Sequence, residues 1–290
     1  MRRLAATLIL TVLAVLPAAA DVRFESVTRS GGQNPNEQMD MTILGYTQGE
    51  VGNFYIQKSS NPFMKEGMYL HTSDGGNSMV LVDPKEETYS EWDLDEIIQM
   101  AGTVIQALGG LVKIEVENPK VELVSKGAGA PLHGLSTEVY VFETSYALLT
   151  RVMGIKQQQL VEEKSTITTT QELSNTSAGV MMRTDPPKTG TELDQMIEAS
   201  PWGKIDGVAV AYRTDTRIVR GKKQNKVDES WSEMTVTALD RSSGGPPGGY
   251  GYPDHYTQVS MMPTAAMTGE QPEEDGKKRR FPGFRRDGGD

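Results

Sequence analysis

Short segments in which apolar and polar side chains alternate recur along this chain, and this pattern limits its fold more than any other feature. Val22 to Val27 alternates in this way near the start, and Val112 to Val116 repeats the pattern later. A period of two residues is typical of a strand with one buried and one solvated face. Gly49 and a cluster of turn formers at Gly31 to Asn36 separate the first such segments. The sequence therefore predicts an antiparallel sheet with one apolar face.

Three short strands and two turns are predicted between Gly67 and Trp92. Asp74-Gly75-Gly76 supplies residues that tolerate positive φ in a hairpin, and Asp83-Pro84 fixes φ for the second turn. The segment Asp74 to Asn77 lacks the acidic spacing and the distal glutamate of an EF-hand, so we interpret it as a turn. Ile155 to Leu173 is also predicted to be strand, with Glu162, Glu163 and Lys164 exposed.

One long helix is predicted after Asp93, which with Glu96 forms a capping box. Gly109-Gly110 ends it, because glycine takes the left-handed cap without steric cost. A shorter helix is predicted from Thr191. The apolar face of the long helix consists of Leu94, Ile97, Ile98, Ala101, Val104, Ile105 and Leu108. The sequence thus indicates a curved antiparallel sheet covered by an amphipathic helix.

The first 20 residues have the organisation of a cleavable secretory signal. Arg2 and Arg3 precede an apolar run from Leu4 to Leu16, and small residues end at Ala20. The alternative, a membrane anchor, would need about 20 apolar residues to span a bilayer. We therefore expect a periplasmic or secreted protein with no transmembrane segment after cleavage. The predicted domains are 1–20 as signal peptide, 21–260 as one β domain and 261–290 as a disordered basic-aromatic tail.

Composition excludes several classes of protein. The chain has no cysteine, so neither a disulfide framework nor thioether lipidation is possible. Loss of Arg2 and Arg3 with the signal takes the net charge from −10 to −12, which disfavours nucleic acid as a partner. No phosphate-binding glycine motif is present, and no cofactor is expected.

No constellation of residues indicates catalysis. A serine nucleophile in a GxSxG turn is absent, and Ser73 and Ser136 lack any catalytic motif. Asp93, Asp95 and Glu96 are explained by helix capping and the helix dipole. We therefore predict a non-enzymatic protein without a metal site. The three histidines, which are too far apart in sequence to form a local ligand set, are His71, His133 and His255.

A groove between the sheet and the long helix is the predicted binding site. A strongly twisted sheet that packs incompletely on its helix leaves a concave apolar space, and flexible methionine side chains could line it. Scattered core methionine is the alternative. The candidate groove residues are Ile97, Ile98, Ala101, Val104, Ile105, Leu108, Met79 and Met68.

The segment Val80 to Leu94, with its D-P-x-x-x-T-Y run at Asp83 to Tyr89, resembles an exported bacterial family known as domain of unknown function 4412. Gly134 to Tyr140 and Tyr252-Pro253 are further similar features. The resemblance implies a half-barrel like that of periplasmic lipoprotein carriers, with an apolar interior and no catalytic residues to carry over. Together with the periodicity it gives an α+β, mainly antiparallel β fold: a curved half-barrel sheet covering one long and one short helix.

Two functions follow as hypotheses. The first is a soluble exported protein that binds an acyl chain, lipid or other apolar molecule in the groove. The second is a protein-interaction or envelope-maintenance module with a self-filled core. The tail segment Lys277 to Arg286, which places basic residues around Phe281 and Phe284, could then contact an envelope component, with a solvated tail as the alternative.

Overall fold

The computed structural model describes residues 21–33, 38–61, 64–93, 112–152, 155–181, 198, 200–221, 226–242 and 244–260. Within these ranges the chain forms one twelve-stranded sheet. Its strands are β1 (Val22–Gly32), β2 (Met39–Gln48), β3 (Val51–Ser59), β4 (Tyr69–Thr72), β5 (Ser78–Asp83), β6 (Thr88–Asp93), β7 (Val112–Ala128), β8 (Glu138–Val152), β9 (Ile155–Thr170), β10 (Val208–Arg220), β11 (Lys226–Asp240) and β12 (Thr257–Gln258). The helix that lies within these ranges is α2 (Ala178–Met181), a single turn.

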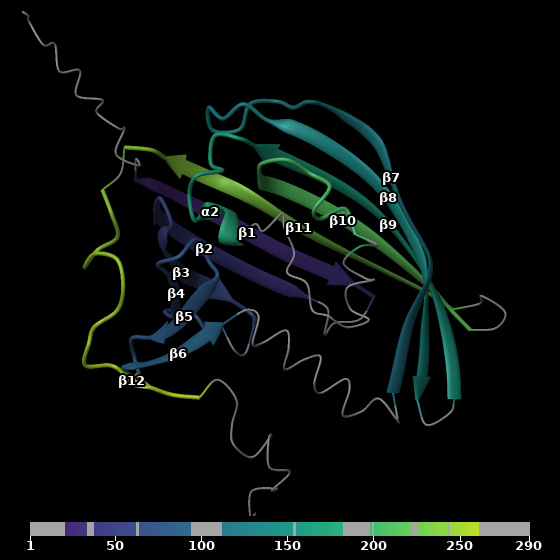
Figure 1. The fold of residues 1–290 in the computed structure, drawn as a ribbon, viewed down its shortest axis with the longest axis horizontal. Coiled ribbons are helices and arrows are strands. Elements are labelled where there is room, and N and C mark those ends of the chain that lie inside the picture. The colour runs from purple at the N-terminus through teal and green to yellow at the C-terminus, as the bar shows by residue number, and fades with distance from the viewer. Residues whose placement is uncertain are drawn as a thin grey trace, which may run out of the picture.

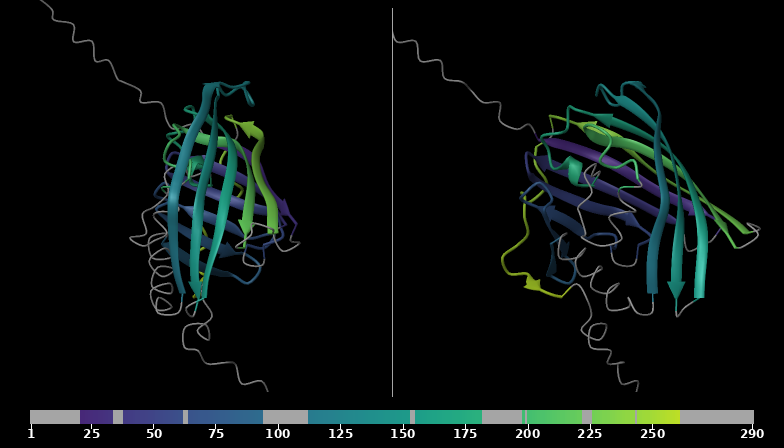
Figure 2. Two further views of the ribbon diagram at one scale, coloured as in Figure 1. Left: turned by 90° about the vertical axis from the view of Figure 1, so that its right-hand side faces the viewer. Right: turned by 45° about the vertical axis from the view of Figure 1, so that its right-hand side comes forward.

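Two antiparallel meanders make up the sheet. β1 to β6 form the first and β7 to β11 the second, and antiparallel pairing of β1 with β11 joins them. β12 runs parallel to β6 at one edge, and β7 forms the other edge. Figure 1 shows one continuous curved sheet, and Figure 2 shows β7 to β9 crossing steeply over the direction of β1 to β3. Register shifts after Glu25 in β1 and after Leu123 in β7 contribute to this bending.

The predicted strands are confirmed, with changes at their boundaries. Val112 to Val116 and Lys120 to Ser125 belong to the single long strand β7. Ser145 to Val152 belongs to β8. The turn at Asp74 is also present, because the Asp74 carboxylate accepts hydrogen bonds from the backbone N–H groups of Gly76 (3.2 Å) and Ser78 (3.0 Å).

The predicted α+β fold class, with one long and one short helix under the sheet, is wrong. The described residues are nearly all β and form one open sheet, and α2 is too short to form a layer. The physical reason is that loops cover the apolar face: Leu135, Leu173 and Ile205 come from connections between strands, and all three are buried in the core. The predicted helices from Leu94 and Thr191 lie outside the described residues, except for Glu198.

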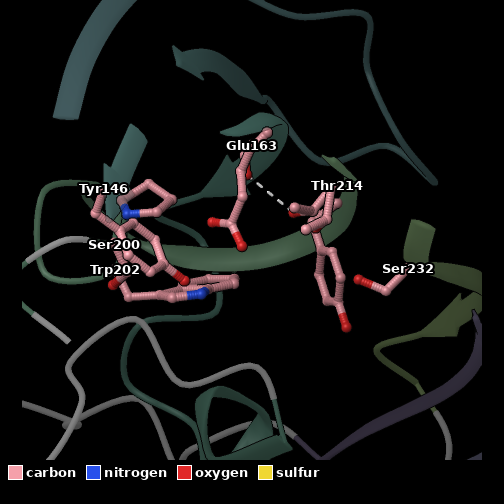
Figure 3. A pocket seen from close by; sticks show the side chains of 10 residues that line it. Tyr146, Glu163, Ser200, Trp202, Thr214 and Ser232 are labelled. Carbon is pink, nitrogen blue, oxygen red and sulfur yellow. Dashed lines mark hydrogen bonds between the residues drawn. The ribbon is translucent and has the colours of Figure 1, made fainter. Parts of the chain in front are cut away.

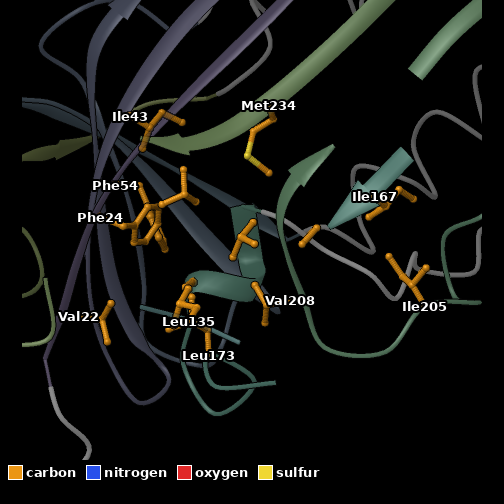
Figure 4. Packing of buried hydrophobic residues seen from close by; sticks show 14 of the residues in the cluster. Val22, Phe24, Ile43, Phe54, Leu135, Ile167, Leu173, Ile205, Val208 and Met234 are labelled. Carbon is orange, nitrogen blue, oxygen red and sulfur yellow. The ribbon is translucent and has the colours of Figure 1, made fainter. Parts of the chain in front are cut away.

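The apolar core spans both meanders and is shown in Figure 4. Phe24 of β1 packs on Phe54 of β3 with ring centroids 6.2 Å apart. Ser177, just before α2, ties the second meander to the first: its N–H donates to Gly49 O (2.7 Å) and its hydroxyl to Val51 O (2.9 Å). The two meanders therefore share one core, which includes Val22, Ile43, Ile167, Val208 and Met234.

Residues 244–260, here called the C-terminal strap, cross the face of the first meander that lies opposite the core. The Tyr69 hydroxyl donates to Gly251 O (3.1 Å), and the Tyr252 ring lies 4.6 Å from the Tyr89 ring. The strap ends as β12, where the N–H of Thr257 donates to Glu87 O (3.0 Å). It therefore covers tyrosine side chains and one sheet edge.

Candidate functional site

The core face of the second meander changes from apolar to polar along its strands. Cross-strand pairing places side chains of β8 to β11 in rows across this face. The first row belongs to the core, and the next two carry mainly hydroxyl groups and one carboxyl group. In order, the rows are Tyr140, Ile167, Tyr212 and Met234; then Phe142, Ser165, Thr214 and Ser232; then Thr144, Glu163 and Thr216.

A loop at residues 200–204 faces these polar rows. The backbone N–H of Lys204 donates to Pro201 O (3.0 Å), which closes a turn around Trp202. The Lys204 ammonium group donates to Glu198 O (2.9 Å) and Ser200 O (2.8 Å) and so holds the start of the loop. Trp202 packs against the core and meets the Tyr212 ring edge to face, with centroids 5.8 Å apart. The loop thereby fixes an indole ring beside the sheet.

A cavity of about 330 Å³ lies between the loop and the sheet and is shown in Figure 3. This volume is within the range of small-molecule sites, roughly 300 to 1,000 Å³. Three aromatic rings supply apolar surface, and hydroxyl groups supply the polar surface. Its lining consists of Tyr146, Glu163, Ser165, Ser200, Pro201, Trp202, Tyr212, Thr214, Thr216 and Ser232.

Glu163 is the one acidic side chain in this lining. Its carboxyl group points into the cavity on the side that holds Trp202 (Figure 3), and no described residue forms a hydrogen bond or ion pair with it. Burial raises the pKa of Glu163, because removal of water penalises the charged form. The Thr144 hydroxyl, opposite Glu163 on β8 but outside this lining, is buried without a hydrogen-bond partner among the described residues.

The tyrosines of the cavity stay uncharged at neutral pH. Burial, together with the nearby charge of Glu163, raises the pKa of Tyr146 to about 12. Burial also raises the pKa of Tyr212. The Ser165 and Thr214 hydroxyls are 2.9 Å apart and hydrogen-bond to each other. Glu163 is thus the one acidic lining group, and burial makes it lose its proton at higher pH than an exposed glutamate.

A second cavity, of about 370 Å³, is lined mostly by charged side chains of β7 to β10. Several of these charges already form ion pairs. Arg217 Nη1 lies 2.6 Å from Glu162 Oε2, and Lys120 Nζ lies 2.7 Å from Glu122 Oε2. Exposed ion pairs of this kind contribute little stability each. We interpret this second cavity as a solvated ion-pair network rather than as a binding site.

Two of the predicted groove residues, Met68 and Met79, lie within the described residues, and neither lines this cavity. Met68 and Met79 pack against the core of the first meander, away from the β8 to β11 lining. The other six predicted residues lie outside the described part of the chain: Ile97, Ile98, Ala101, Val104, Ile105 and Leu108.

Tyr146, Trp202 and Tyr212 were not predicted as site residues. The exposed positions predicted for Glu162 and Glu163 are wrong, because both are half-buried, whereas Lys164 is exposed as predicted. A signal was present, because alternation in β9 puts Glu163 on the same face as Ser165 and the buried Ile167.

Comparisons with known proteins leave the family open. No family model and no curated protein matches the chain. A solved structure of PNGF-II is similar over 83% of this chain at 11% identity and a TM-score of 0.31, and the chain spans about a third (31%) of that protein's length. A putative outer membrane lipoprotein-sorting protein domain from Vibrio parahaemolyticus is similar over 80% of this chain and 89% of its own length, at 8% identity and a TM-score of 0.26. These scores are too low to carry an argument about function, and the resemblance to domain of unknown function 4412 stays a prediction. Among the described residues, no helix has the length and apolarity needed to cross a membrane.

Proposed function

We propose that this protein is a non-enzymatic binding protein, exported from the cytoplasm, which holds a small, partly apolar ligand in the cavity beneath Trp202. One observation carries the proposal: a cavity of about 330 Å³ places three aromatic rings around a carboxyl group that has no partner among the described residues. Aromatic walls with a few converging polar groups are typical of small-molecule sites.

The lining supports binding rather than chemistry. Hydrolytic or acid–base catalysis by side chains uses a nucleophile next to a base, or two titratable groups with different roles. The cavity offers Glu163 alone, since its tyrosines have raised pKa values and its lining contains no histidine. Ser165 is hydrogen-bonded to Thr214 rather than to a base.

The ligand is expected to combine an apolar body with a polar end. Trp202 and Tyr212 present apolar ring surface next to the core, whereas Thr216 and Ser232 lie on the polar rows. An acyl chain or lipid with a polar head meets this description. We therefore expect the ligand to occupy the space between the sheet and the 200–204 loop.

Native mass spectrometry of the chain, produced with its predicted signal and purified from the periplasm, tests this proposal. We expect a reproducible mass increment that disappears in Thr216→Trp, which fills the cavity. Thr166→Trp on the neighbouring strand is the matched control, because Thr166 is exposed. Absence of any retained ligand, together with failure to take up the neutral apolar dye Nile red, would contradict the proposal.

An interaction or envelope-maintenance module is the second candidate. The observation in its favour is that the shared core is filled by the protein's own side chains, since Phe24, Phe54 and Ile56 are almost fully buried. The tail that would contact an envelope component lies outside the described residues. Deletion of residues 273–290 separates the two candidates, because it should abolish envelope binding and leave cavity binding unchanged.

A further inference from the structure

We propose that the polar end of the ligand is an organic cation, an alkylated ammonium group that lies against the rings of Trp202, Tyr212 and Tyr146 with Glu163 as its counter-ion. This inference rests on the proposed function and names the chemistry that the same cavity would recognise. It concerns four side chains from β8, β9, β10 and the 200–204 loop, which are far apart in the sequence.

The rings of Trp202 and Tyr212 are nearly perpendicular to each other in this cavity. Their ring planes make an angle of 89° in an edge-to-face contact, so the two rings present surface in two directions. Tyr146 belongs to the lining from the β8 side. A cation near the face of an aromatic ring is attracted by the ring's quadrupole, and tryptophan gives the strongest attraction. Alkyl groups on the cation also gain from burial against the rings.

The cavity lining carries one acidic side chain and no basic one, which favours a positively charged ligand. Glu163 has no ionic partner among the described residues, and the cavity lining contains neither lysine nor arginine. Three other glutamates of the second meander are paired: Glu162 with Arg217, Glu172 with Arg241, and Glu233 with Arg213. A carboxylate held in partly buried surroundings without a cation is costly, and a bound cation would offset that cost.

Metal ions and sugars fit this lining less well. A metal ion takes several oxygen or nitrogen ligands, and no group of three or more acidic, histidine or cysteine side chains in the described residues could hold one. A neutral sugar could use the Thr216 and Ser232 hydroxyls, but it would leave Glu163 without a counter-charge. A tetraalkylammonium group needs no hydrogen bonds and matches a site made of ring faces and one negative charge.

Protonation of Glu163 should oppose binding. In this cavity the titratable groups beside it are Tyr146 on β8 and Tyr212 on β10, while β11 and the 200–204 loop contribute Ser232, Ser200, Pro201 and Trp202. Glu163 also lines the second cavity, whose charged residues are Lys120, Glu122, Glu143, Glu162, Lys164, Asp215 and Arg217. Both tyrosines are uncharged at neutral pH, and the charged groups of the second cavity keep their charge between about pH 6 and pH 8, so Glu163 is the group whose protonation changes the charge of this cavity. Affinity for a cation should therefore rise with pH as Glu163 loses its proton, and this dependence should vanish in Glu163→Gln.

Isothermal titration calorimetry with choline and with its neutral isostere 3,3-dimethylbutan-1-ol tests the inference on the full mature chain. We expect choline to bind at least about tenfold more tightly than the isostere. Glu163→Gln should lower choline affinity about tenfold or more and leave the isostere unaffected. Trp202→Leu should weaken choline binding by roughly 3- to 30-fold, and Trp202→Phe, which keeps a ring, by less. Glu143→Gln, which changes an exposed acidic residue outside this lining, is the matched control.

Flotation with vesicles identifies the source of the cation. Binding to phosphatidylcholine vesicles but not to phosphatidylglycerol vesicles, lost in Glu163→Gln, would support the inference with a lipid head group as the ligand. Binding of free choline alone would support it with a soluble ligand. Equal affinity for choline and its isostere, or no binding of either, would overturn it. A different result would contradict the proposed function, namely equal Nile red affinity of the wild type and Thr216→Trp.

Discussion

Gly45 lies in β2 directly against the ring of Phe24. A Cβ atom at this position would be 2.4 Å from two atoms of that ring, and Phe24 is 1% exposed and packed on Phe54. Because the ring has no free space to enter, Gly45→Ala is expected to lower the free energy of unfolding by about 1 to 3 kcal/mol. Urea denaturation followed by circular dichroism measures this. Gly127→Ala in β7, where no atom lies within 4 Å, is the control; an equal loss in both variants would contradict the packing described.

His71, which lies beneath the C-terminal strap, should make the stability of the protein depend on pH. Its Nδ1 lies 2.7 Å from Asn53 Oδ1 and 3.2 Å from Gly52 O, so Nδ1 carries the donated proton. Burial lowers the pKa of His71 below its ordinary value of 6.5. The unfolded chain therefore takes up a proton at higher pH than the folded chain, and stability falls as pH drops through 6.5 toward the lowered pKa.

Replacement of His71 should make the free energy of unfolding depend less steeply on pH. In His71→Gln the free energy of unfolding is expected to change less between about pH 7 and pH 5 than in the wild type. Thermal unfolding in a series of buffers measures both slopes. Parallel slopes in the two proteins would show that His71 is not responsible.

At the scale of elements, the C-terminal strap should stabilise the first meander. Tyr250 donates to Asp21 Oδ1 (3.2 Å), and Val259 N–H donates to Tyr89 O (2.8 Å), so the strap spans from the start of the described chain to the sheet edge. A chain that ends at Ser242 loses these contacts and exposes Tyr69, which is 7% exposed in the intact protein. We expect a loss of about 2 to 4 kcal/mol in the free energy of unfolding.

A chain that ends at Ser260 is the control for this truncation. It keeps every strap contact described above, so its melting temperature should equal that of the full mature chain. If both truncations melt alike, the strap does not stabilise the meander.

The strands could be predicted from the sequence, whereas the cover of the sheet and the cavity could not. Alternation at Val22 to Val27 and the turn at Asp74 depend on neighbouring residues, so a local pattern is enough to find them. The cavity depends on the pairing of β8 with β9 and β10, and on a turn that brings Trp202 over that pairing. Nothing in the local sequence around Trp202 indicates that Glu163 lies beside it.

At the scale of the whole molecule, the two meanders should unfold together. They are joined by the antiparallel pairing of β1 with β11, by one apolar core and by the hydrogen bonds from Ser177 to Gly49 and Val51. Because neither meander buries its core face without the other, differential scanning calorimetry is expected to show one cooperative transition. Two resolved transitions would mean that the meanders are separate folding units.

Binding in the cavity beneath Trp202 is the central claim, and a Nile red titration compared across three proteins tests it most directly. The account predicts that the wild type and Thr166→Trp bind the dye with equal affinity, because Thr166 is exposed and outside the cavity lining. Thr216→Trp places an indole in the cavity and should bind at least about tenfold more weakly. Equal affinity in all three proteins, or no binding by the wild type, would contradict the claim.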